Sequence, residues 1–202
     1  MHPREMLRAI EKALPKNSMV STDIGNICSV SNSYLRFDEP RSMFAAMSFG
    51  NCGYAFPVAI GAKIAAPDRP AFAYVGDGAW GISLNELLTC AREKIGVTVI
   101  LFNNGQWGAE KKNHVDFYSR RYQGVELVNP SWAAVAKSFG CEGITVDKVG
   151  DVGAAIQAAV KNQAEGKTTV LEMMVTKELG DPFRRDALSK PVRHLDKYKS
   201  FV

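Results

Sequence analysis

Two apolar runs constrain the fold most, because each ends in residues suited to binding a ligand rather than to extending a strand. Residues 71–75 form the first run and are followed by Gly76-Asp77-Gly78, and residues 97–102 form the second and are followed by Asn103-Asn104. Continuous apolar runs of this length are typical of strands that are covered on both faces, as in parallel sheets. The carboxyl ends of such strands meet at one edge, where α/β folds place their ligands.

The rest of the chain alternates between strand and helix patterns. We expect strands at residues 19–22, 42–47, 71–75, 97–102, 144–146 and 169–175, and helices at residues 3–14, 54–65, 84–91, 132–139 and 149–160. This order predicts an α/β fold, a doubly wound parallel sheet with helices on both faces, over residues 1–176.

Two segments lack core periodicity. Residues 105–129 show no apolar repeat, and we expect an irregular, functional segment there. Residues 177–202 are charged and contain Pro182 and Pro191, which indicates a C-terminal tail that serves as a lid or a subunit contact.

Composition narrows the classes of function. The 46% hydrophobic content is ample for a packed core, and the net charge of +4 comes from scattered basic residues, so we expect no nucleic-acid partner. The four cysteines are widely spaced and no His lies at ligand spacing, which disfavours zinc and disulfides and indicates the cytoplasm. No apolar run approaches membrane-spanning length, so we expect no membrane partner.

The residues around Asp77 suit an anion bound through a metal ion. Glycines on both sides let the backbone approach a ligand closely, and the free N–H groups of the following helix favour a diphosphate. A carboxylate repels a phosphate unless a hard cation such as Mg²⁺ lies between them, and Asn103 or Asn104 could supply a second oxygen ligand. By itself, Gly-Asp-Gly is more often a simple turn.

Taken together, the two clusters resemble the thiamine diphosphate (ThDP) motif of the decarboxylase and acetolactate synthase superfamily, in which Asp77 and Asn104 lie 27 positions apart (104 minus 77). The resemblance implies that Asp77, Asn104 and the backbone carbonyl of Gln106 hold Mg²⁺. It also implies which residues line the diphosphate: Gly25, Asn26, Ile27, Gly76, Gly78 and Ala79. For residues 23–27, a plain strand-to-helix turn is an equally good interpretation.

Residues 49–62 resemble the superfamily segment that packs against the aminopyrimidine ring of ThDP. The resemblance implies that the Gly50 carbonyl accepts a hydrogen bond from the 4′-amino group. It places Cys52 at the position where a larger apolar side chain usually bends the cofactor into its V shape. A thiol is smaller, so we expect a neighbouring residue to share this contact. The alternative is that Cys52 is a small buried residue at a helix start.

Within the superfamily, residues 21–29, 106–113 and 178–188 are similar to the C-terminal portion of the sulfoacetaldehyde acetyltransferases. This resemblance implies a ThDP- and Mg²⁺-dependent acyltransferase that converts sulfoacetaldehyde and phosphate to acetyl phosphate and sulfite. Family members are several hundred residues long, so we expect the pyrimidine-binding domain to be missing here. Its glutamate, which activates ThDP, would come from a partner domain or chain in a homo- or hetero-oligomer, and the chain alone would be inactive.

Two other interpretations stay open. One is a subunit of a ThDP-dependent 2-oxo acid decarboxylase or synthase, and the other is a catalytically silent cofactor-binding or assembly module.

The substrate and the acceptor are both small anions, and their binding requires fixed positive charge. Arg184 and Arg185 in the tail are the first candidates, followed by Lys111 near the metal ligands, with Lys112 and His114 beside it. The alternative is that these charges are solvated or lie at a subunit contact.

Overall fold

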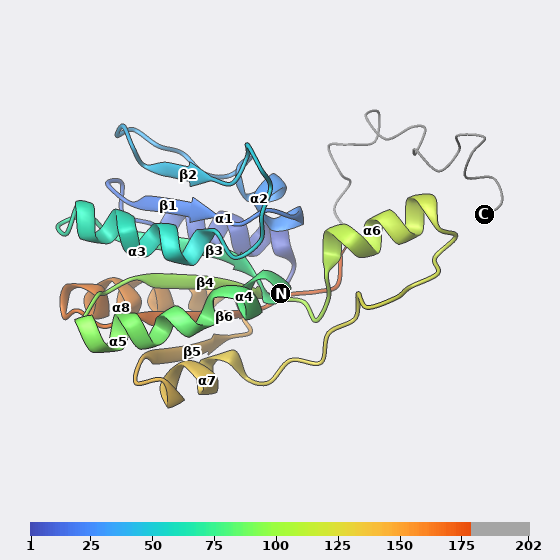
Figure 1. Ribbon diagram of the computed structural model, residues 1–202. Coiled ribbons are helices and arrows are strands. Elements are labelled where there is room, and N and C mark those ends of the chain that lie inside the picture. Colours follow the sequence, from blue (N-terminus) through green and yellow to red (C-terminus); the bar gives the residue numbers. More distant parts are fainter. Residues whose placement is uncertain (179–202) are drawn as a thin grey trace.

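A parallel six-stranded sheet forms the centre of the protein in the computed structural model, which describes residues 1–178 apart from the side chains of residues 27–29 (Figure 1). The strand order is β2-β1-β3-β4-β6-β5. The strands are β1 (Met19–Thr22), β2 (Met43–Ala45), β3 (Ala71–Gly76), β4 (Thr98–Asn103), β5 (Glu142–Val146) and β6 (Thr169–Met174). Each adjacent pair is parallel, which confirms the predicted sheet.

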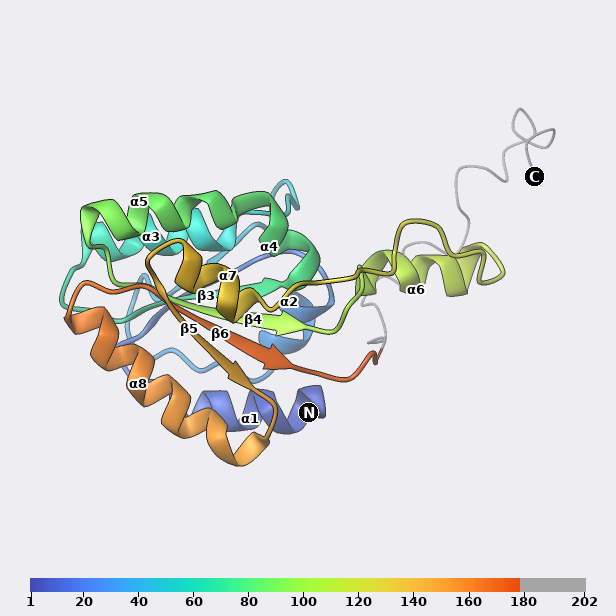
Figure 2. The same ribbon diagram turned by 90° about the horizontal axis from the view of Figure 1, so that it is seen from below.

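Helices cover both faces of the sheet (Figures 1 and 2). One layer contains α1 (Pro3–Ala13), α2 (Asn26–Ser31) and α8 (Val152–Ala164), and the other contains α3 (Ala55–Ala65), α5 (Leu87–Glu93) and α7 (Trp132–Ser138). The doubly wound architecture expected from the alternating sequence pattern is therefore present.

The central strands explain why the core divides into two layers. Successive side chains of a strand point to opposite faces, and β3 shows this alternation while being buried along nearly its whole length. Ala73 and Val75 pack with the α3 layer, whereas Phe72 and Tyr74 pack with the α1 layer. A strand covered on both faces needs apolar residues at every position, which is the pattern that residues 71–75 show.

The direction of the chain connections changes between β1 and β3. The chain leaving β1 continues to β2 at one edge, whereas the chain leaving β3 continues to β4 on the opposite side. In open parallel sheets, such a switch separates the loops beyond the strand ends and creates a binding crevice. The loops that follow β1 and β3 therefore lie where the sequence predicts that the ligand binds.

The prediction of an irregular segment at residues 105–129 was wrong in part. Residues Gly108–Phe117 form a helix, α6, which projects beyond the sheet (Figures 1 and 2). None of its residues is buried, so the helix carries no apolar stripe that a sequence pattern would reveal. An ion pair between Lys112 and Asp116 at 2.5 Å, one helical turn apart, lies within the helix.

The helix after the Gly-Asp-Gly cluster is not continuous. It consists of α4 (Asp77–Ser83), the 3₁₀ turn η1 (Leu84–Glu86) and α5. Leu87 is fully buried, but Leu88 is 58% exposed, so only part of the expected apolar face packs on the sheet. A second 3₁₀ turn, η2 (Val149–Asp151), precedes α8.

The predicted tail lies outside the described residues except for Lys177 and Glu178, so its extent stays a prediction. Within residues 1–178, no helix combines the length and the apolar content that crossing a bilayer requires.

Close packing of α7 against β5 leads to a test of the fold. A Cβ atom on Gly143 would lie 2.0 Å from the carbonyl oxygen of Ala133, a backbone atom that cannot rotate away. We expect Gly143→Ala to lower the free energy of unfolding by about 1–3 kcal/mol or more, because overpacking usually costs an amount in this range. Gly150→Ala is the matched control, because nothing lies within 4 Å of its Cβ position. Equal melting temperatures of the two variants in thermal unfolding would contradict this packing.

Candidate functional site

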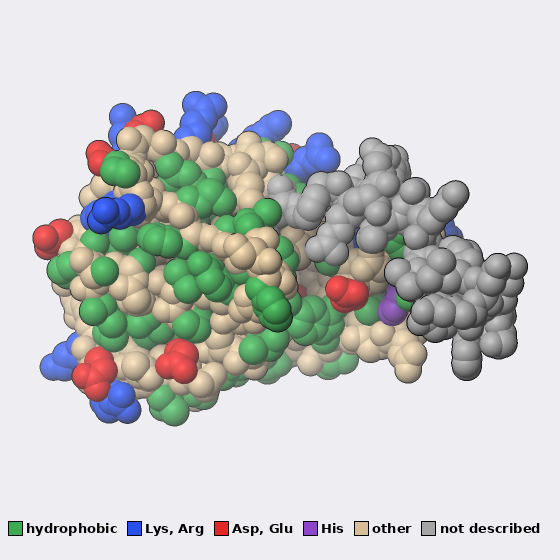
Figure 3. Space-filling view, turned by 45° about the horizontal axis from the view of Figure 1, so that its top comes forward, with side chains coloured by type: hydrophobic (Ala, Val, Ile, Leu, Met, Phe, Trp, Pro, Cys, Tyr) green, Lys and Arg blue, Asp and Glu red, His purple; other side chains and the backbone are tan. Residues whose placement is uncertain are grey.

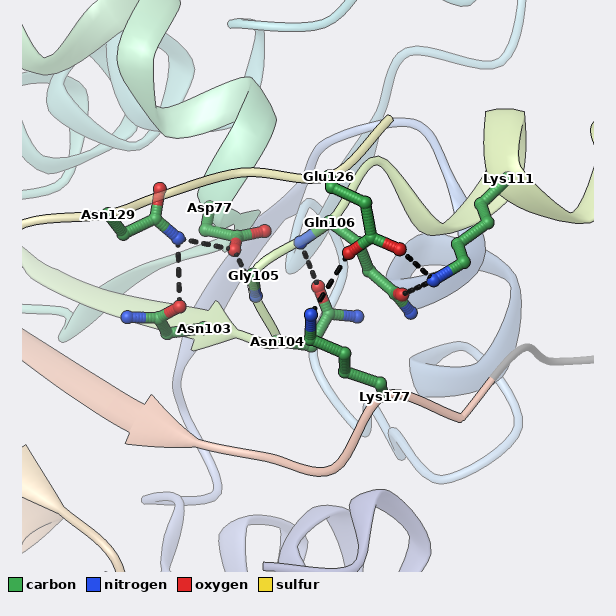
Figure 4. A network of polar contacts seen from close by, with 9 residues as sticks. All are labelled: Asp77, Asn103, Asn104, Gly105, Gln106, Lys111, Glu126, Asn129 and Lys177. Carbon is green, nitrogen blue, oxygen red and sulfur yellow. Dashed lines mark hydrogen bonds and ion pairs between the residues drawn. The ribbon is translucent and has the colours of Figure 1, made fainter. Parts of the chain in front are cut away.

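The side chain of Asp77 lies at the junction of β3 and α4 and is only 3% exposed. Its Oδ2 atom accepts hydrogen bonds from the Gly105 backbone N–H and the Asn129 side-chain amide, both at 2.7 Å (Figure 4). Its Oδ1 atom accepts one longer bond of 3.1 Å from the Gly78 N–H. Burial raises the pKa of Asp77, and these donors oppose the rise by stabilising the carboxylate.

The two asparagines at the end of β4 occupy different environments. Asn103 is buried in the sheet, where its Oδ1 accepts from Asn129 at 2.9 Å and its Nδ2 donates to Glu172 at 2.9 Å. Asn104 lies beyond the strand, and its Oδ1 accepts a bond of 3.2 Å from the Gln106 N–H (Figure 4). Asn103 therefore has a structural role, and Asn104 is the better placed of the two to bind a metal ion.

Three side-chain amides gather around Gly108, the first residue of α6. A Cβ atom there would lie 3.3 Å from Asn26 Nδ2, 3.7 Å from Asn104 Nδ2 and 3.9 Å from Gln106 Nε2. The Nδ2 of Asn26 and the Nε2 of Gln106 are buried and have no hydrogen-bond partner among the described residues. Buried donors without acceptors are unfavourable, and the oxygens of a diphosphate would satisfy them. The donor set therefore fits the expected cofactor.

The loop after β1 brings Asn26 to this position. Gly25 has a φ of 121°, a backbone conformation that favours glycine, and α2 begins immediately afterwards. The side chain of Ile27 lies outside the described residues. Contacts of Gly25, Asn26 and Ile27 with the diphosphate stay predictions.

One of the small residues after β3, Gly78, packs against the side chain of Trp107. A Cβ atom on Gly78 would lie 2.7 Å from the indole ring of Trp107, so glycine is needed at this position even without a ligand. Gly76 precedes the first turn of α4, and Ala79 is buried within that turn. Contact of Gly76, Gly78 and Ala79 with a diphosphate also stays a prediction.

A buried carboxylate holds the loop expected to contact the aminopyrimidine ring. Asp23 Oδ1 accepts a bond of 2.9 Å from the Tyr54 N–H, which ties the end of β1 to the start of α3. Burial raises the pKa of Asp23 to about 6, although N–H groups near the start of α3 oppose the rise. Gly50 has a φ of 79°, and Cys52 is half-buried with its pKa raised by burial and by Asp23. Both residues lie between β2 and α3, as expected.

The candidate anion-binding residues are either engaged elsewhere or not described. Lys111 pairs with Glu126 and donates to Gln106 Oε1 at 3.2 Å (Figure 4). Its Nζ atom also lies 5.1 Å from the ring centroid of Tyr122. Lys177 also pairs with Glu126, at 3.0 Å. Lys111 is therefore one member of a charge cluster beside Gln106 rather than an isolated cation.

The remaining candidates are Lys112, His114, Arg184 and Arg185. Lys112 pairs with Asp116, and His114 packs against the ring of Tyr118. Arg184 and Arg185 lie outside the described residues.

Four residues around the site were not predicted from the sequence: Glu126, Asn129, Glu172 and Lys177. No sequence pattern indicates a contact between Asn129 and Asp77, because Asn129 is an ordinary loop residue 52 positions away. Glu172 does carry a sequence signal, since it is a carboxylate within the apolar strand β6 and buried charges require partners.

The side chains near the site limit which metal ion it could bind. Among the side chains that the structure describes, no three from His, Cys, Asp or Glu are grouped as metal ligands. The predicted ligands are instead the Asp77 carboxylate, the Asn104 amide oxygen and the Gln106 backbone carbonyl, a set that suits Mg²⁺ when phosphate oxygens complete the shell.

Comparison with known proteins decides the family. The C-terminal TPP binding domain of thiamine pyrophosphate enzymes matches residues 23–173, which include both β-strand ends of the site. The chain belongs to this family. Thiamine pyrophosphate is another name for ThDP, so the expected cofactor is confirmed for the family.

Several curated proteins are similar to this TPP-binding domain over its whole length. The sulfoacetaldehyde acetyltransferases of Alcaligenes xylosoxydans xylosoxydans and Castellaniella defragrans are 66% and 62% identical to it over 203 aligned residues. Each alignment covers 100% of this chain and 34% of the relative. The chain thus spans about a third of the length of the curated relatives it matches.

The fold is shared with solved enzymes of lower sequence identity. The benzoylformate decarboxylase from Polynucleobacter necessarius superposes with a TM-score of 0.79 at 21% identity, over 90% of this chain and 34% of that one. At this identity, the likeness concerns the fold of the TPP-binding domain alone.

The raised pKa of Asp23 predicts a dependence of stability on pH. The ordinary pKa of an aspartate is 3.8 and that of Asp23 in the fold is about 6, so its contribution to stability is greatest below pH 3.8 and is lost as the pH rises through 6. Each tenfold difference in proton affinity between the folded and unfolded chain is equivalent to about 1.4 kcal/mol. Asp23→Asn cannot titrate, so its stability relative to the native protein should rise between about pH 4 and pH 6 and then level off. Urea unfolding at several pH values measures this, and parallel curves would contradict it.

Proposed function

We propose that this chain is the ThDP- and Mg²⁺-binding part of a sulfoacetaldehyde acetyltransferase, which converts sulfoacetaldehyde and phosphate to acetyl phosphate and sulfite. The observation that carries the proposal is the 66% identity to a protein of that name over 100% of this chain. The acetolactate synthase large subunit of Corynebacterium glutamicum is 29% identical over 178 residues. The chain therefore resembles the acetyltransferases well beyond the cofactor motif that both groups share.

In this proposal, Mg²⁺ binds to Asp77, Asn104 and the backbone carbonyl of Gln106, and it links them to the diphosphate. Support comes from the hydrogen bonds of Asp77, since Oδ2 already accepts two bonds of 2.7 Å. Oδ1 accepts one bond of 3.1 Å and is the oxygen with capacity for a metal ion.

The other residues bind and orient the cofactor. The Nδ2 of Asn26 and the Nε2 of Gln106 would donate to diphosphate oxygens, since both nitrogens are buried without a partner among the described residues. The Gly50 carbonyl would accept from the 4′-amino group, and Cys52 would pack beside the ring. When bound, the cofactor supplies the nucleophilic carbon that reacts with the substrate carbonyl.

A partner completes the site in this proposal. It is a pyrimidine-binding domain or chain, which provides the activating glutamate in a homo- or hetero-oligomer. Support comes from large apolar side chains exposed near the site, Met47, Phe49 and Ile82. Figure 3 shows apolar side chains spread over the face that carries α3, with basic and acidic residues at its margins. Exposed apolar surface of this kind is typical of an interface.

Two further points stay predictions. Arg184 and Arg185, followed by Lys111, are still the candidates for binding the sulfonate or the phosphate. The cytoplasmic location rests on the cysteines, of which Cys52, Cys90 and Cys141 are free thiols.

The metal site predicts the effect of removing one carboxylate. Asp77→Ala should weaken Mg²⁺-dependent ThDP binding by at least about 100-fold, because it removes a ligand and also removes the acceptor of three hydrogen bonds. Asp68→Ala is the control, since Asp68 is an exposed residue in the turn before β3. Titration of ThDP at a series of Mg²⁺ concentrations, followed by tryptophan fluorescence, measures the effect. Unchanged affinity of the Asp77 variant would contradict the assignment.

The reaction itself is tested with this chain combined with a pyrimidine-binding partner. We expect release of sulfite and formation of acetyl phosphate from sulfoacetaldehyde and phosphate, and negligible turnover from the 202-residue chain alone. Release of CO₂ from a 2-oxo acid without sulfite would support a decarboxylase or synthase instead. Full activity of the isolated chain would contradict the need for a partner.

A further inference from the structure

The segment that contains α6 begins and ends at the same carboxylate oxygen. Residue 105, at its start, donates its N–H to Asp77 Oδ2, and Asn129, at its end, donates its side-chain amide to the same atom. Both distances are 2.7 Å (Figure 4). Backbone bonds from Trp107 to Val125 and from Leu127 to Gly105, both 2.9 Å, join the two arms of this segment beside the site.

Asn129 also connects Asp77 to the interior of the sheet. Its Nδ2 donates a second bond, of 2.9 Å, to Asn103 Oδ1, and Asn103 Nδ2 donates to Glu172 Oε1 at 2.9 Å. Because a carboxylate can only accept, Glu172 and Asp77 at the two ends fix the orientation of both amides between them. Both bonds donated by Asn129 and the one donated by Asn103 therefore run in a fixed direction along this row of four side chains.

Glu172 is held firmly at the far end of the row. It lies on β6, is 2% exposed and accepts bonds of 3.1 Å from the backbone N–H groups of Trp132 and Ala133 at the start of α7. The hydroxyl groups of Thr145 and Ser131 donate to it at 3.1 Å and 3.3 Å. The row therefore starts from a rigid point of the sheet and reaches the residue proposed to bind the metal ion.

We propose that Asn129 is a positioning residue for the metal ion, oriented through Asn103 by Glu172. By occupying Asp77 Oδ2 together with the Gly105 N–H, Asn129 prevents the carboxylate from rotating and leaves Oδ1 directed to the cation. Partners that orient metal ligands in this way typically change metal affinity about 10- to 100-fold when mutated. The inference rests on the proposed Mg²⁺ site but not on the identity of the substrate.

Two substitutions test this role. Asn129→Ala removes both donated bonds, and Asn129→Asp keeps the shape but directs acceptor atoms at Asp77 Oδ2 and Asn103 Oδ1. Asn129 is half-buried, so we expect both variants to fold. In the assembly with its pyrimidine-binding partner and ThDP, the dissociation constant of Mn²⁺, measured by electron paramagnetic resonance, should rise about 10-fold or more, and further for Asp than for Ala.

A control separates positioning from stability. Asn162 is also half-buried and donates its amide to Thr169 Oγ1 at 3.0 Å, at the opposite end of β6 from the site. Asn162→Ala should lower the melting temperature as Asn129→Ala does, but leave Mn²⁺ affinity unchanged. Saturating metal should also restore ThDP affinity in the Asn129 variants, which a damaged fold would not allow.

The outcomes distinguish this inference from the proposed function. Native Mn²⁺ affinity in both Asn129 variants would overturn the positioning role alone, as would an equal loss in Asn162→Ala. Absence of Mn²⁺ binding in the native assembly would overturn the metal site and this inference together. Weakened Mn²⁺ binding in the variants of an assembly that releases no sulfite would support the positioning role while refuting the proposed reaction.

Discussion

A buried carboxylate must have donors or a cation around it, and this requirement at Asp77 organises the whole edge of the sheet. Asp77 begins α4 at the end of β3, yet its oxygens accept from the loops after β4 and before α7 as well as from its own helix. Burial alone raises its pKa, and the surrounding N–H groups stabilise the charge. A local element thus depends on contacts made far away in the sequence.

The parallel sheet makes these contacts possible. The ends of β1, β3 and β4 lie side by side, so the loops that follow them converge although they are far apart in the sequence. Asp23 holds the loop before α3 in the same way that Asp77 holds the segment around α6. Two buried carboxylates at adjacent strand ends therefore set the backbone on both sides of the crevice.

The sequence predicts the sheet and its helices because their signals are local. Strands β3 and β4 are apolar along most of their length, and the position of Asp77 and Asn104 at their ends follows directly from that pattern. The α6 helix was missed, since it buries no residue and leaves no periodicity to detect. Asn129 was missed because only the folded chain brings it to Asp77. Lys111 was expected to serve an anion, and its pairing with Glu126 likewise depends on a contact across the segment.

The most direct test of this account is a crystal structure of the complete assembly with ThDP and Mn²⁺, in which anomalous scattering locates the metal ion. We expect a peak bound by Asp77 Oδ1, Asn104 Oδ1, the Gln106 carbonyl and diphosphate oxygens, with Asp77 Oδ2 still bonded to Gly105 and Asn129. A metal ion on Asp77 Oδ2, or one that Asn104 does not contact, would contradict it.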